Sequence, residues 1–391
     1  MWQIYCDTTA FLSRNGYQGH CGWYLDSMKA FDTVPHVRLI KKLQAYGIGG
    51  EMLAWITEYL KGRSQIVVVN GEKSLPANVI SGIPQCTVLG PLLFVRYIND
   101  LLENVRSEGF LFADDAKIFH KITCKDDALL LQKDIHELES WSNKWLLKFH
   151  PDKCHLLTLG KFENIKYCHR YTVGNKEIEH TSEEKDLGVV IDSELTFADH
   201  INEKVKKANC LVGMIRRSFS YMDSSTFLKI YTAFVRPHLE YAQAIWAPHL
   251  RKFVNAIENV QMRATRLIDG FGKLSYKERL IKLKLPSLTY RRLRGDMIET
   301  YKHFRSYDKD ILPPAFRSRN RPSRTHSYQL HRMKPSDGER GVQNNSFYYR
   351  IADTWNNLPS DVVEAPTIDT FKNRLDKFWK DLPLKFDHTS I

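Results

Sequence analysis

The chain has 391 residues and a formal net charge of +12, with 43% hydrophobic and 26% charged residues. This composition is typical of folded globular domains and argues against a disordered or fibrous chain, and no apolar stretch reaches the roughly 18 residues that a membrane span needs. Residues 196–310 hold 22 Lys and Arg against 11 Asp and Glu, which indicates a localised surface for a polyanion.

Helices and strands alternate in the first part of the chain. Pro35 opens an amphipathic helix, and a second helix is expected directly afterwards, over residues 51–62. Residues 63–80 contain two β-rich runs that meet at Asn70-Gly71, which is a strong signal for a hairpin.

Two adjacent carboxylates mark the next predicted hairpin. An apolar helix is expected over residues 88–105, and the segment GFLFADDAKIFH follows it. Its apolar runs on both sides of Asp114 and Asp115 predict a hairpin with both carboxylates at its tip. A long helix over residues 126–147 and shorter strands up to residue 192 complete an α+β segment.

The second half of the chain reads as helical. Apolar residues recur at spacings of three and four from Phe197 to Ile215, so one long amphipathic helix is expected there. Further helices are expected around residues 224–236, 251–268 and 289–304.

Three carboxylates in two contexts are the main candidates for a catalytic site. Asp26 follows the apolar run Trp23-Tyr24-Leu25, as expected at the end of a strand, whereas Asp114 and Asp115 occupy the predicted hairpin tip. Carboxylates brought together repel one another unless a hard divalent cation neutralises them. Two such ions about 4 Å apart would activate a hydroxyl group and stabilise a leaving pyrophosphate. A lone Asp-Asp pair is usually only a turn, and the apolar flanks favour the catalytic alternative.

The seven cysteines include no Cys-x-x-Cys pair, and their irregular spacing favours reduced thiols inside the cell. Cys154-His155 and Cys168-His169 offer a zinc alternative, but adjacent residues in a strand point to opposite faces. The N-terminal residues show no secretory signal. We therefore expect an intracellular protein that is neither secreted nor embedded in a membrane.

Four segments follow one another in the chain: YLDSMKAFDTVPHVRLIKKLQAYGI, SGIPQCTVLGPLLFVRYINDL, FLFADDAKIFH and WLLKFHPDKCHLLTLG. In this order they resemble the successive palm motifs of reverse transcriptases from non-LTR (LINE-type) retrotransposons. EKDLGVVID is similar to the primer-grip strand pair of the same family, and VRPHLEYAQAIWAPHL and TWNNLP are similar to its jockey-like and chicken-repeat-like clades. The resemblance covers most of the chain, from residue 24 to residue 381.

The resemblance implies a catalytic set of four residues. Asp26 and Asp114 would be the principal metal ligands, and Asp115 a weaker ligand or a partner of the primer end. Lys153 would protonate or neutralise the pyrophosphate, with a solvated surface lysine as the alternative. The implied cofactor is Mg²⁺ or Mn²⁺.

The nucleotide would lie between an aromatic ring and a loop. Phe31 matches the bulky residue that blocks a ribonucleotide 2′-hydroxyl, although by pattern alone a core aromatic is favoured. Gly82, Pro84 and Gln85 match the loop against the template base and the incoming nucleotide, where a glycine allows close backbone approach.

The resemblance also implies contacts to the primer and the duplex. Leu187 and Gly188 would hold the primer 3′ end. Basic residues of the helical segment would contact phosphates. The main candidates are Arg216, Arg217, Arg263 and Arg266, with Arg291, Arg292 and Arg294 as further ones. Tyr241 and Trp246 are candidates for base stacking, but packing is the favoured role.

The implied fold is α+β, a right-hand polymerase palm followed by an all-helical thumb and a small C-terminal unit. The palm with its primer grip would span residues 24–195 and the basic thumb residues 196–310. A linker rich in Pro, Arg and Ser would span residues 311–344, before the C-terminal unit at 345–391. Residues 1–23 do not resemble the fingers region of the family, so we expect an N-terminally truncated chain that begins with an unassigned stub.

Some positions depart from the family pattern. Cys86 stands where the family carries glycine, so it is expected to crowd the template or to force an unfavourable backbone angle. Ser27 replaces a large apolar residue, and His150 replaces an asparagine. Arg96 lies in an otherwise apolar helix, where it must reach solvent to avoid a large burial cost.

The function expected from these features is RNA-directed DNA polymerisation, in which two metal ions assist the addition of dNTPs to a primer 3′ end. Its partners would be an RNA template and a DNA primer or target, and its site of action the nucleus, with assembly in the cytoplasm. One alternative is a catalytically silent remnant that only binds nucleic acid. The other is a two-metal phosphodiesterase, which would need neither Phe31 nor the loop at Gly82–Gln85.

Overall fold

The computed structural model describes residues 20–159, 170–306, 326, 328–330 and 347–390. Contacts divide these residues into two compact units, and the boundary lies between Glu184 and Lys185. Most of the expected stub and of the expected linker lies outside the described residues. No helix in the described ranges is long and apolar enough to cross a membrane.

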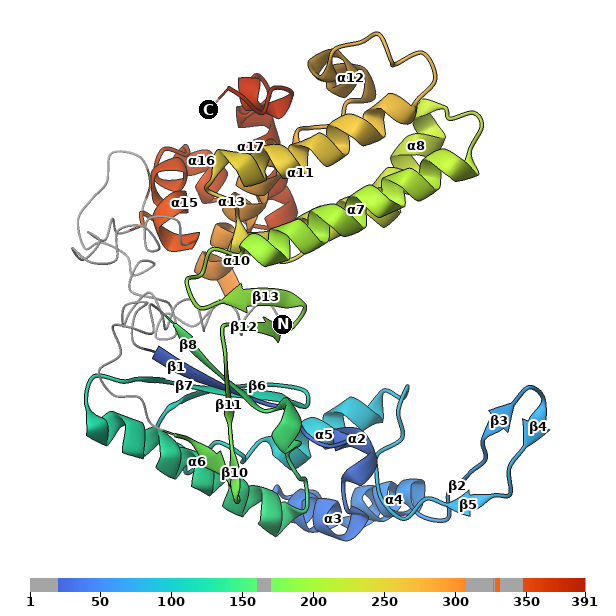
Figure 1. The fold of residues 1–391 in the computed structure, drawn as a ribbon, viewed down its shortest axis with the longest axis vertical. Coiled ribbons are helices and arrows are strands. Elements are labelled where there is room, and N and C mark those ends of the chain that lie inside the picture. Colours follow the sequence, from blue (N-terminus) through green and yellow to red (C-terminus); the bar gives the residue numbers. More distant parts are fainter. Residues whose placement is uncertain (1–19, 160–169, 307–325, 327, 331–346, 391) are drawn as a thin grey trace. The chain divides into compact units, whose positions relative to one another are not determined.

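A five-stranded sheet forms the centre of the first unit, with strand order β11-β8-β1-β7-β6 (Figure 1). The strands are β1 (His20–Leu25), β6 (Glu108–Phe112), β7 (Asp115–Lys121), β8 (His155–Leu159) and β11 (Glu179–Thr181). β1 is antiparallel to both β7 and β8, whereas β11 is parallel to β8. The first unit therefore has the mixed α+β character that the sequence predicted. A separate two-stranded ribbon consists of β9 (Thr172–Val173) and β10 (Lys176–Glu177).

The helices of the first unit are α2 (Ala30–Thr33), α3 (His36–Ala45), α4 (Gly50–Leu60), α5 (Leu89–Ile98) and α6 (Lys125–Trp145), with a 3₁₀ turn at Pro151–Lys153. α3 begins directly after Pro35, as predicted. α5 ends at Ile98 rather than near residue 105, and Asp100 follows shortly after its end. Its carboxylate accepts hydrogen bonds from Lys42 Nζ and from Trp141 Nε1, the latter at 3.0 Å.

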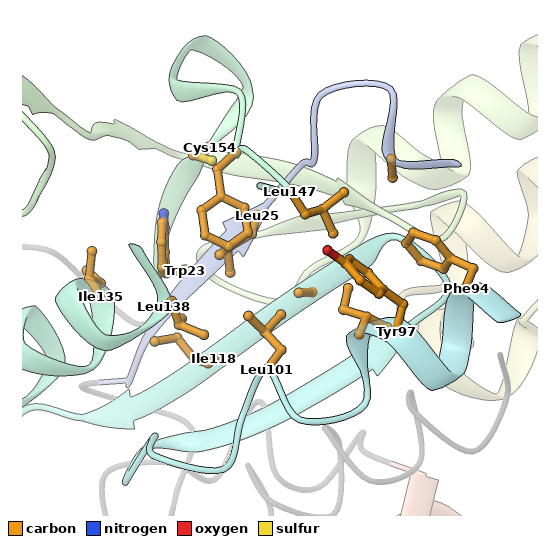
Figure 2. Close-up of a cluster of buried hydrophobic side chains, with 14 of the residues drawn as sticks. Trp23, Leu25, Phe94, Tyr97, Leu101, Ile118, Ile135, Leu138, Leu147 and Cys154 are labelled. Carbon is orange, nitrogen blue, oxygen red and sulfur yellow. The ribbon is translucent and has the colours of Figure 1, made fainter. Parts of the chain in front are cut away.

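Alternate residues of β1 supply the core between the sheet and the helices. Trp23 and Leu25 point into a buried cluster with Ile118 of β7 and with Ile135 and Leu138 of α6 (Figure 2). Full burial of side chains of this size contributes roughly 1.5–3 kcal/mol each. This packing fixes β1 and therefore the position of the residue that follows it.

The predicted hairpin at residues 63–80 is present and highly exposed. It comprises β2 (Ser64–Gln65), β3 (Val68–Val69), β4 (Glu72–Lys73) and β5 (Ala77–Asn78). Asn70 and Gly71 both adopt positive φ, 52° and 89°, at the turn between β3 and β4, as a tight two-residue hairpin turn requires.

A hairpin whose first strand crosses the boundary between the units precedes the helices of the second unit. The hairpin strands are β12 (Glu183–Asp186) and β13 (Val189–Asp192). The helices are α7 (Ala198–Ser218), α8 (Ser224–Ile230), α9 (Arg236–Glu240), α10 (Gln243–Trp246), α11 (Arg251–Ala264), α12 (Tyr276–Leu283), α13 (Leu288–Ser306), α15 (Phe347–Asn356), α16 (Ser360–Val363) and α17 (Ile368–Phe378). A π-helical turn at Tyr231–Val235 joins α8 to α9, and 3₁₀ turns lie at Thr265–Leu267 and Pro383–Lys385.

The C-terminal helices share their core with α13. Phe347 and Trp355 are buried in one cluster with Tyr290, Met297 and Tyr301. The segment expected to form a separate C-terminal unit therefore packs with helices of the expected thumb. A segment of about 45 residues buries a smaller share of its surface than a larger domain does when it folds alone, so packing against α13 adds to the burial of these aromatic side chains.

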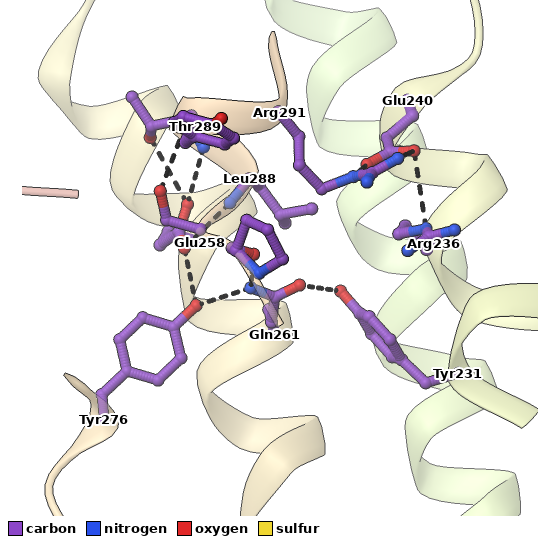
Figure 3. Close-up of polar contacts among 12 residues, drawn as sticks. Tyr231, Arg236, Glu240, Glu258, Gln261, Tyr276, Leu288, Thr289 and Arg291 are labelled. Atoms are coloured by element: carbon purple, nitrogen blue, oxygen red, sulfur yellow. Dashed lines mark hydrogen bonds and ion pairs between the residues drawn. The ribbon is translucent and has the colours of Figure 1, made fainter. Parts of the chain in front are cut away.

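A buried carboxylate anchors the start of α13. Glu258 of α11 accepts hydrogen bonds from Leu288 N at 3.2 Å, Thr289 N at 3.3 Å and Tyr276 Oη at 2.6 Å (Figure 3). Burial raises the pKa of Tyr276, so its hydroxyl remains a donor. A negative charge at a helix N-terminus is stabilised by the unpaired N–H groups there.

Candidate active site

Strand register brings the predicted carboxylates to one edge of the sheet. β1 pairs with β7 so that Leu25 lies opposite Ala116, and the next residue on each strand is an aspartate, Asp26 and Asp115. Asp114 lies in the tight turn of the β6–β7 hairpin, which closes at the pair Phe112–Asp115. The hairpin with its carboxylates at the tip is therefore present where the sequence predicted it.

The tip of this hairpin carries backbone strain. Ala113 has a φ of +52°, a conformation that a side chain with a Cβ atom adopts at a cost of roughly 1–2 kcal/mol. Such strain persists only where the surrounding structure imposes it, and it is common at functional sites. Here the pairing of β6 with β7 imposes it, and Asp114 follows directly.

An inserted turn positions Lys153 beside Asp26. Tyr24 lies opposite His155, but Ser27 bridges to Phe149, so three extra residues separate the two pairings on the second strand. They form the 3₁₀ turn Pro151–Lys153, from which Lys153 Nζ reaches Asp26 Oδ2 at 3.3 Å. The side chains of this pair are 58% and 42% exposed.

The carboxylates fit a hard divalent cation in their chemistry and in their position on the sheet. Asp114 is half-buried and Asp115 is exposed. Within the described ranges, however, no three His, Cys, Asp or Glu side chains lie close enough together to hold a metal ion. The backbone thus gathers the predicted ligands at one edge, while Asp26 is paired with Lys153.

Phe31 is half-buried and packs on α5. Its ring stacks on that of Phe94, with centroids 4.3 Å apart and planes inclined by 22°. The ring therefore has the packing role that pattern alone favoured, and its partial exposure leaves it available to a ligand.

The loop that contains Gly82, Pro84 and Gln85 is bound to the backbone around Phe31. Gly82 N donates to Val34 O at 2.9 Å, and Ile83 N donates to Phe31 O at 2.7 Å. Gly82 has a φ of +93°, and a Cβ atom there would lie 2.7 Å from the backbone oxygen of Asp32. The close approach that requires glycine is therefore an approach to protein backbone.

The sequence reasoning missed two residues that contact this loop. Asp32 Oδ1 accepts a hydrogen bond from Gln85 Nε2 at 2.9 Å, and His36 Nε2 lies 2.7 Å from Gly82 O. Both residues belong to the first quoted motif. No local pattern in that motif marked their contact with a loop about 50 residues away.

The residues that depart from the family pattern are accommodated in different ways. Cys86 is exposed and has a φ of +57°, which confirms the expected unfavourable backbone angle. Arg96 is exposed, with its guanidinium 5.6 Å from the ring centroid of Tyr46, so no charge is buried. Ser27 is buried in its bridge to Phe149, and His150 N donates to Asp26 O at 2.8 Å.

The expected primer-grip residues form the turn of the β12–β13 hairpin in the second unit. Leu187 and Gly188 both have positive φ, 43° and 85°. Tyr241 Oη donates to Leu187 O at 2.7 Å, and Trp246 Nε1 donates to Tyr241 O at 2.7 Å. Trp246 is only 1% exposed, so its packing role is confirmed.

The arginines of the helical segment divide into two groups. Arg216, Arg217, Arg263 and Arg266 are exposed on α7, on α11 and on the turn after α11. Arg291 and Arg294 instead have acidic partners, Glu240 and Asp376, and Arg292 is buried. These last three were further candidates for phosphate contacts, but Arg291 and Arg294 are paired with carboxylates of the protein and Arg292 is buried.

The zinc alternative finds no support in the described residues. Cys154 is 1% exposed, and burial raises the pKa of its thiol to about 11. His155 Nδ1 lies 2.9 Å from Glu184 Oε2. Cys168 and His169 lie outside the described residues.

Several known proteins resemble this chain. The family described as reverse transcriptase (RNA-dependent DNA polymerase) matches residues 6–191, a match that begins inside the expected stub. The RNA-directed DNA polymerase from mobile element jockey of Drosophila funebris is 30% identical over 276 residues, 66% of this chain and 29% of that protein. The probable RNA-directed DNA polymerase from transposon X-element of Drosophila melanogaster is 26% identical over 63% of this chain and 28% of that protein.

The matched part of the chain thus spans less than a third of the length of these relatives. Among solved structures, telomerase from Candida albicans in complex with a fragment of telomeric RNA aligns with a TM-score of 0.33 and 10% identity, over 79% of this chain and 53% of that one. An alignment at this score carries no weight for the fold. The family match and the jockey relatives do carry weight: residues 6–191 match the reverse transcriptase family, and the chain is similar to the RNA-directed DNA polymerases of jockey and other non-LTR retrotransposons.

Proposed function

We propose that this chain supplies the catalytic part of an RNA-directed DNA polymerase, which adds dNTPs to a primer 3′ end on an RNA template. The observation that carries the proposal is the strand register that ends with Leu25 opposite Ala116, so that Asp26 and Asp115 follow at the same edge of the sheet, with Asp114 in the adjoining turn. The family match over residues 6–191 supports the same reaction class. Reverse transcriptases use divalent metal ions, and Mg²⁺ or Mn²⁺ is the ion that we propose here.

Asp26, Asp114 and Asp115 would hold the metal ions, which when bound supply charge neutralisation at the reacting phosphate. Lys153 then has two possible partners, the Asp26 carboxylate and the phosphate of the leaving group. With the carboxylate bound to a metal ion, the ammonium group, which lies 3.3 Å from it in this structure, would be available to neutralise or protonate the pyrophosphate. Phe31 would exclude a 2′-hydroxyl group, and Gly82, Pro84 and Gln85 would line the nucleotide site.

The domain assignment is part of the same proposal. Residues 24–195 would form the palm and residues 196–310 a thumb whose exposed arginines contact duplex phosphates. The linker would span 311–344 and the C-terminal unit 345–391. Leu187 and Gly188 would contact the primer end, and we place the reaction in the nucleus.

Primer extension on an RNA template with Mg²⁺ and dNTPs tests this function. Asp114→Asn removes one carboxylate charge with almost no change in shape, so extension should fall at least 100-fold, in line with the loss of a metal ligand. Asp126→Asn is the matched control, because it makes the same chemical change at an exposed carboxylate of α6 and should leave extension unchanged. Equal extension by wild type and Asp114→Asn would refute the assignment of the site.

A second candidate function is nucleic-acid binding without catalysis. It is favoured by the pairing of Asp26 with Lys153 and by the strained Cys86 beside the loop. In that case the wild-type chain would bind an RNA–DNA duplex in a salt-dependent manner but extend no primer. A hydrolytic activity on the same carboxylates would instead release nucleotides from the duplex, and the reaction products distinguish the three outcomes.

A further inference from the structure

The loop Ser81–Gln85 is attached to the segment from Phe31 to His36 by hydrogen bonds from both backbone and side chains. Two of them, from Gly82 N and Ile83 N, are backbone bonds. The side-chain bonds are of a different kind, because they come from polar residues that have no part in the core. Ser81 Oγ donates to Asp32 O at 3.0 Å, in addition to the contacts of Asp32 and His36 described above.

The contact between Asp32 and Gln85 fixes the orientation of an amide. A carboxylate only accepts hydrogen bonds, so Gln85 must turn its NH₂ group toward Asp32 Oδ1, 2.9 Å away. The amide oxygen Oε1 is then directed away from Asp32. The Gln85 side chain is exposed to solvent, so this oxygen is accessible to a ligand. Gln85 is thereby set to accept a hydrogen bond from a ligand rather than to donate one from its tethered nitrogen.

His36 acts on the same loop from the start of α3. Gly82 O is an acceptor, so the Nε2 atom of His36, 2.7 Å away, must carry the proton. This bond holds the loop at Gly82, where the absence of a Cβ atom allows contact with the Asp32 backbone. Asp32 and His36 together constrain both ends of the loop, and neither side chain is needed for the core of the first unit.

We propose that Asp32 and His36 are positioning residues for the nucleotide site: His36 fixes the loop backbone at Gly82, and Asp32 orients the Gln85 amide so that its oxygen accepts from a donor group of the incoming dNTP. This proposal rests on the proposed function, because it assigns a role within the same reaction. It predicts that Asp32 acts on substrate through Gln85, and that the two residues are therefore energetically coupled.

A double-mutant cycle in steady-state primer extension tests the coupling. Asp32→Asn permits the Gln85 amide to bind in either orientation, so KM for the dNTP should rise about tenfold, as expected for one hydrogen bond to a charged group, while kcat changes less than about threefold. Gln85→Ala should raise KM to a similar extent. Asp32→Asn added to Gln85→Ala should then have no further effect, whereas a merely structural role for Asp32 would make the two effects multiply.

Two further measurements keep the outcome interpretable. Asp126→Asn controls for the chemical change and should leave KM unaltered. Hydrogen exchange at the amides of Gly82 and Ile83 reports the loop without any need for activity, and it should become at least tenfold faster in His36→Ala than in wild type. If the wild-type chain extends no primer but exchange accelerates as stated, the proposed function fails and the anchoring of the loop stands. If extension proceeds and the effects of Asp32→Asn and Gln85→Ala multiply, the orienting role of Asp32 is overturned.

Discussion

The backbone conformation of Cys86 is unfavourable for a residue that has a side chain. With a φ of +57° it occupies the left-handed region, which costs a residue with a Cβ atom roughly 1–2 kcal/mol. Its position directly after Gln85 means that the strain is located at the proposed nucleotide loop. The reverse transcriptases that this chain resembles carry glycine at this position, where the same φ carries no such cost.

Replacing Cys86 with glycine should therefore stabilise the protein. The relief of the φ strain exceeds the entropy that a glycine adds to the unfolded chain, so the net gain should be about 0.5–1 kcal/mol. Urea unfolding followed by circular dichroism measures it. Cys86→Ala keeps a Cβ atom and removes only the thiol, so it should give no gain. A gain of equal size in both variants would trace the effect to the thiol instead.

At the scale of elements, His200 joins the helix α7 to the strand β13. The side chain is fully buried, and its Nδ1 atom accepts a hydrogen bond from Val190 N at 3.2 Å. Its ring also packs near that of Trp246, at 5.2 Å between centroids. Only the neutral imidazole can accept this bond, and burial, together with the positive charge of Lys204, lowers the pKa of His200 to about 4.

This depressed pKa makes the second unit sensitive to acid. Because the unfolded chain takes up the proton near the ordinary value of about 6.5, the stabilisation is complete above that pH and is lost as the pH falls toward 4. The loss should approach 3 kcal/mol, on the order of the shift itself. His200→Asn offers an acceptor that does not titrate, so its unfolding free energy, measured by urea titration from pH 7 to 4, should decline less steeply than that of wild type. Parallel curves for the two proteins would contradict the role of His200.

Some of the helices, strands and turns could be predicted from the sequence, whereas some of the contacts between them could not. The hairpins at Asn70-Gly71 and at Asp114-Asp115 follow from local turn chemistry and alternating apolar residues, and both are present. The partners of Arg291 and Arg294 could not be predicted, since Glu240 and Asp376 lie 51 and 82 residues away in the chain. The contact between Asp32 and Gln85 is likewise long-range, because 53 residues separate them. Local patterns determine the elements, whereas these contacts depend on tertiary packing that a pattern does not encode.

The candidate active site likewise combines a feature that the sequence predicted with features that it did not. The apolar run before Asp26 was enough to place it at the end of a strand. The position of Lys153 beside it depends on a three-residue insertion in the pairing of β1 with β8, which no feature of the sequence marks. The pairing of Asp26 with this lysine was not predicted for the same reason.

At the scale of the whole molecule, the charge is segregated along the chain. Residues 1–195 hold 22 Lys and Arg against 25 Asp and Glu, whereas residues 196–310 hold twice as many basic as acidic residues. The part of the chain with the carboxylates is thus close to neutral, and the helical part is strongly basic. Some of its basic residues, such as Arg291 and Arg294, are already paired with carboxylates, so the number of basic residues alone overstates the surface that is available to phosphates.

Salt-dependent binding of an RNA–DNA duplex separates the exposed arginines from the compensated ones. Each phosphate contact releases counterions and adds about 0.9 to the slope of log K against log salt concentration. Replacing both Arg216 and Arg217 with Gln should therefore lower the magnitude of that slope by up to about 1.8. Replacing both with Lys keeps the charge and should leave the slope unchanged. Arg294→Gln should lower the melting temperature without altering the slope, because the charge of Arg294 is already bound to Asp376 at 2.8 Å. Fluorescence anisotropy across a series of salt concentrations measures all four proteins, and an unchanged slope in the Gln pair would show that the end of α7 lies away from the duplex.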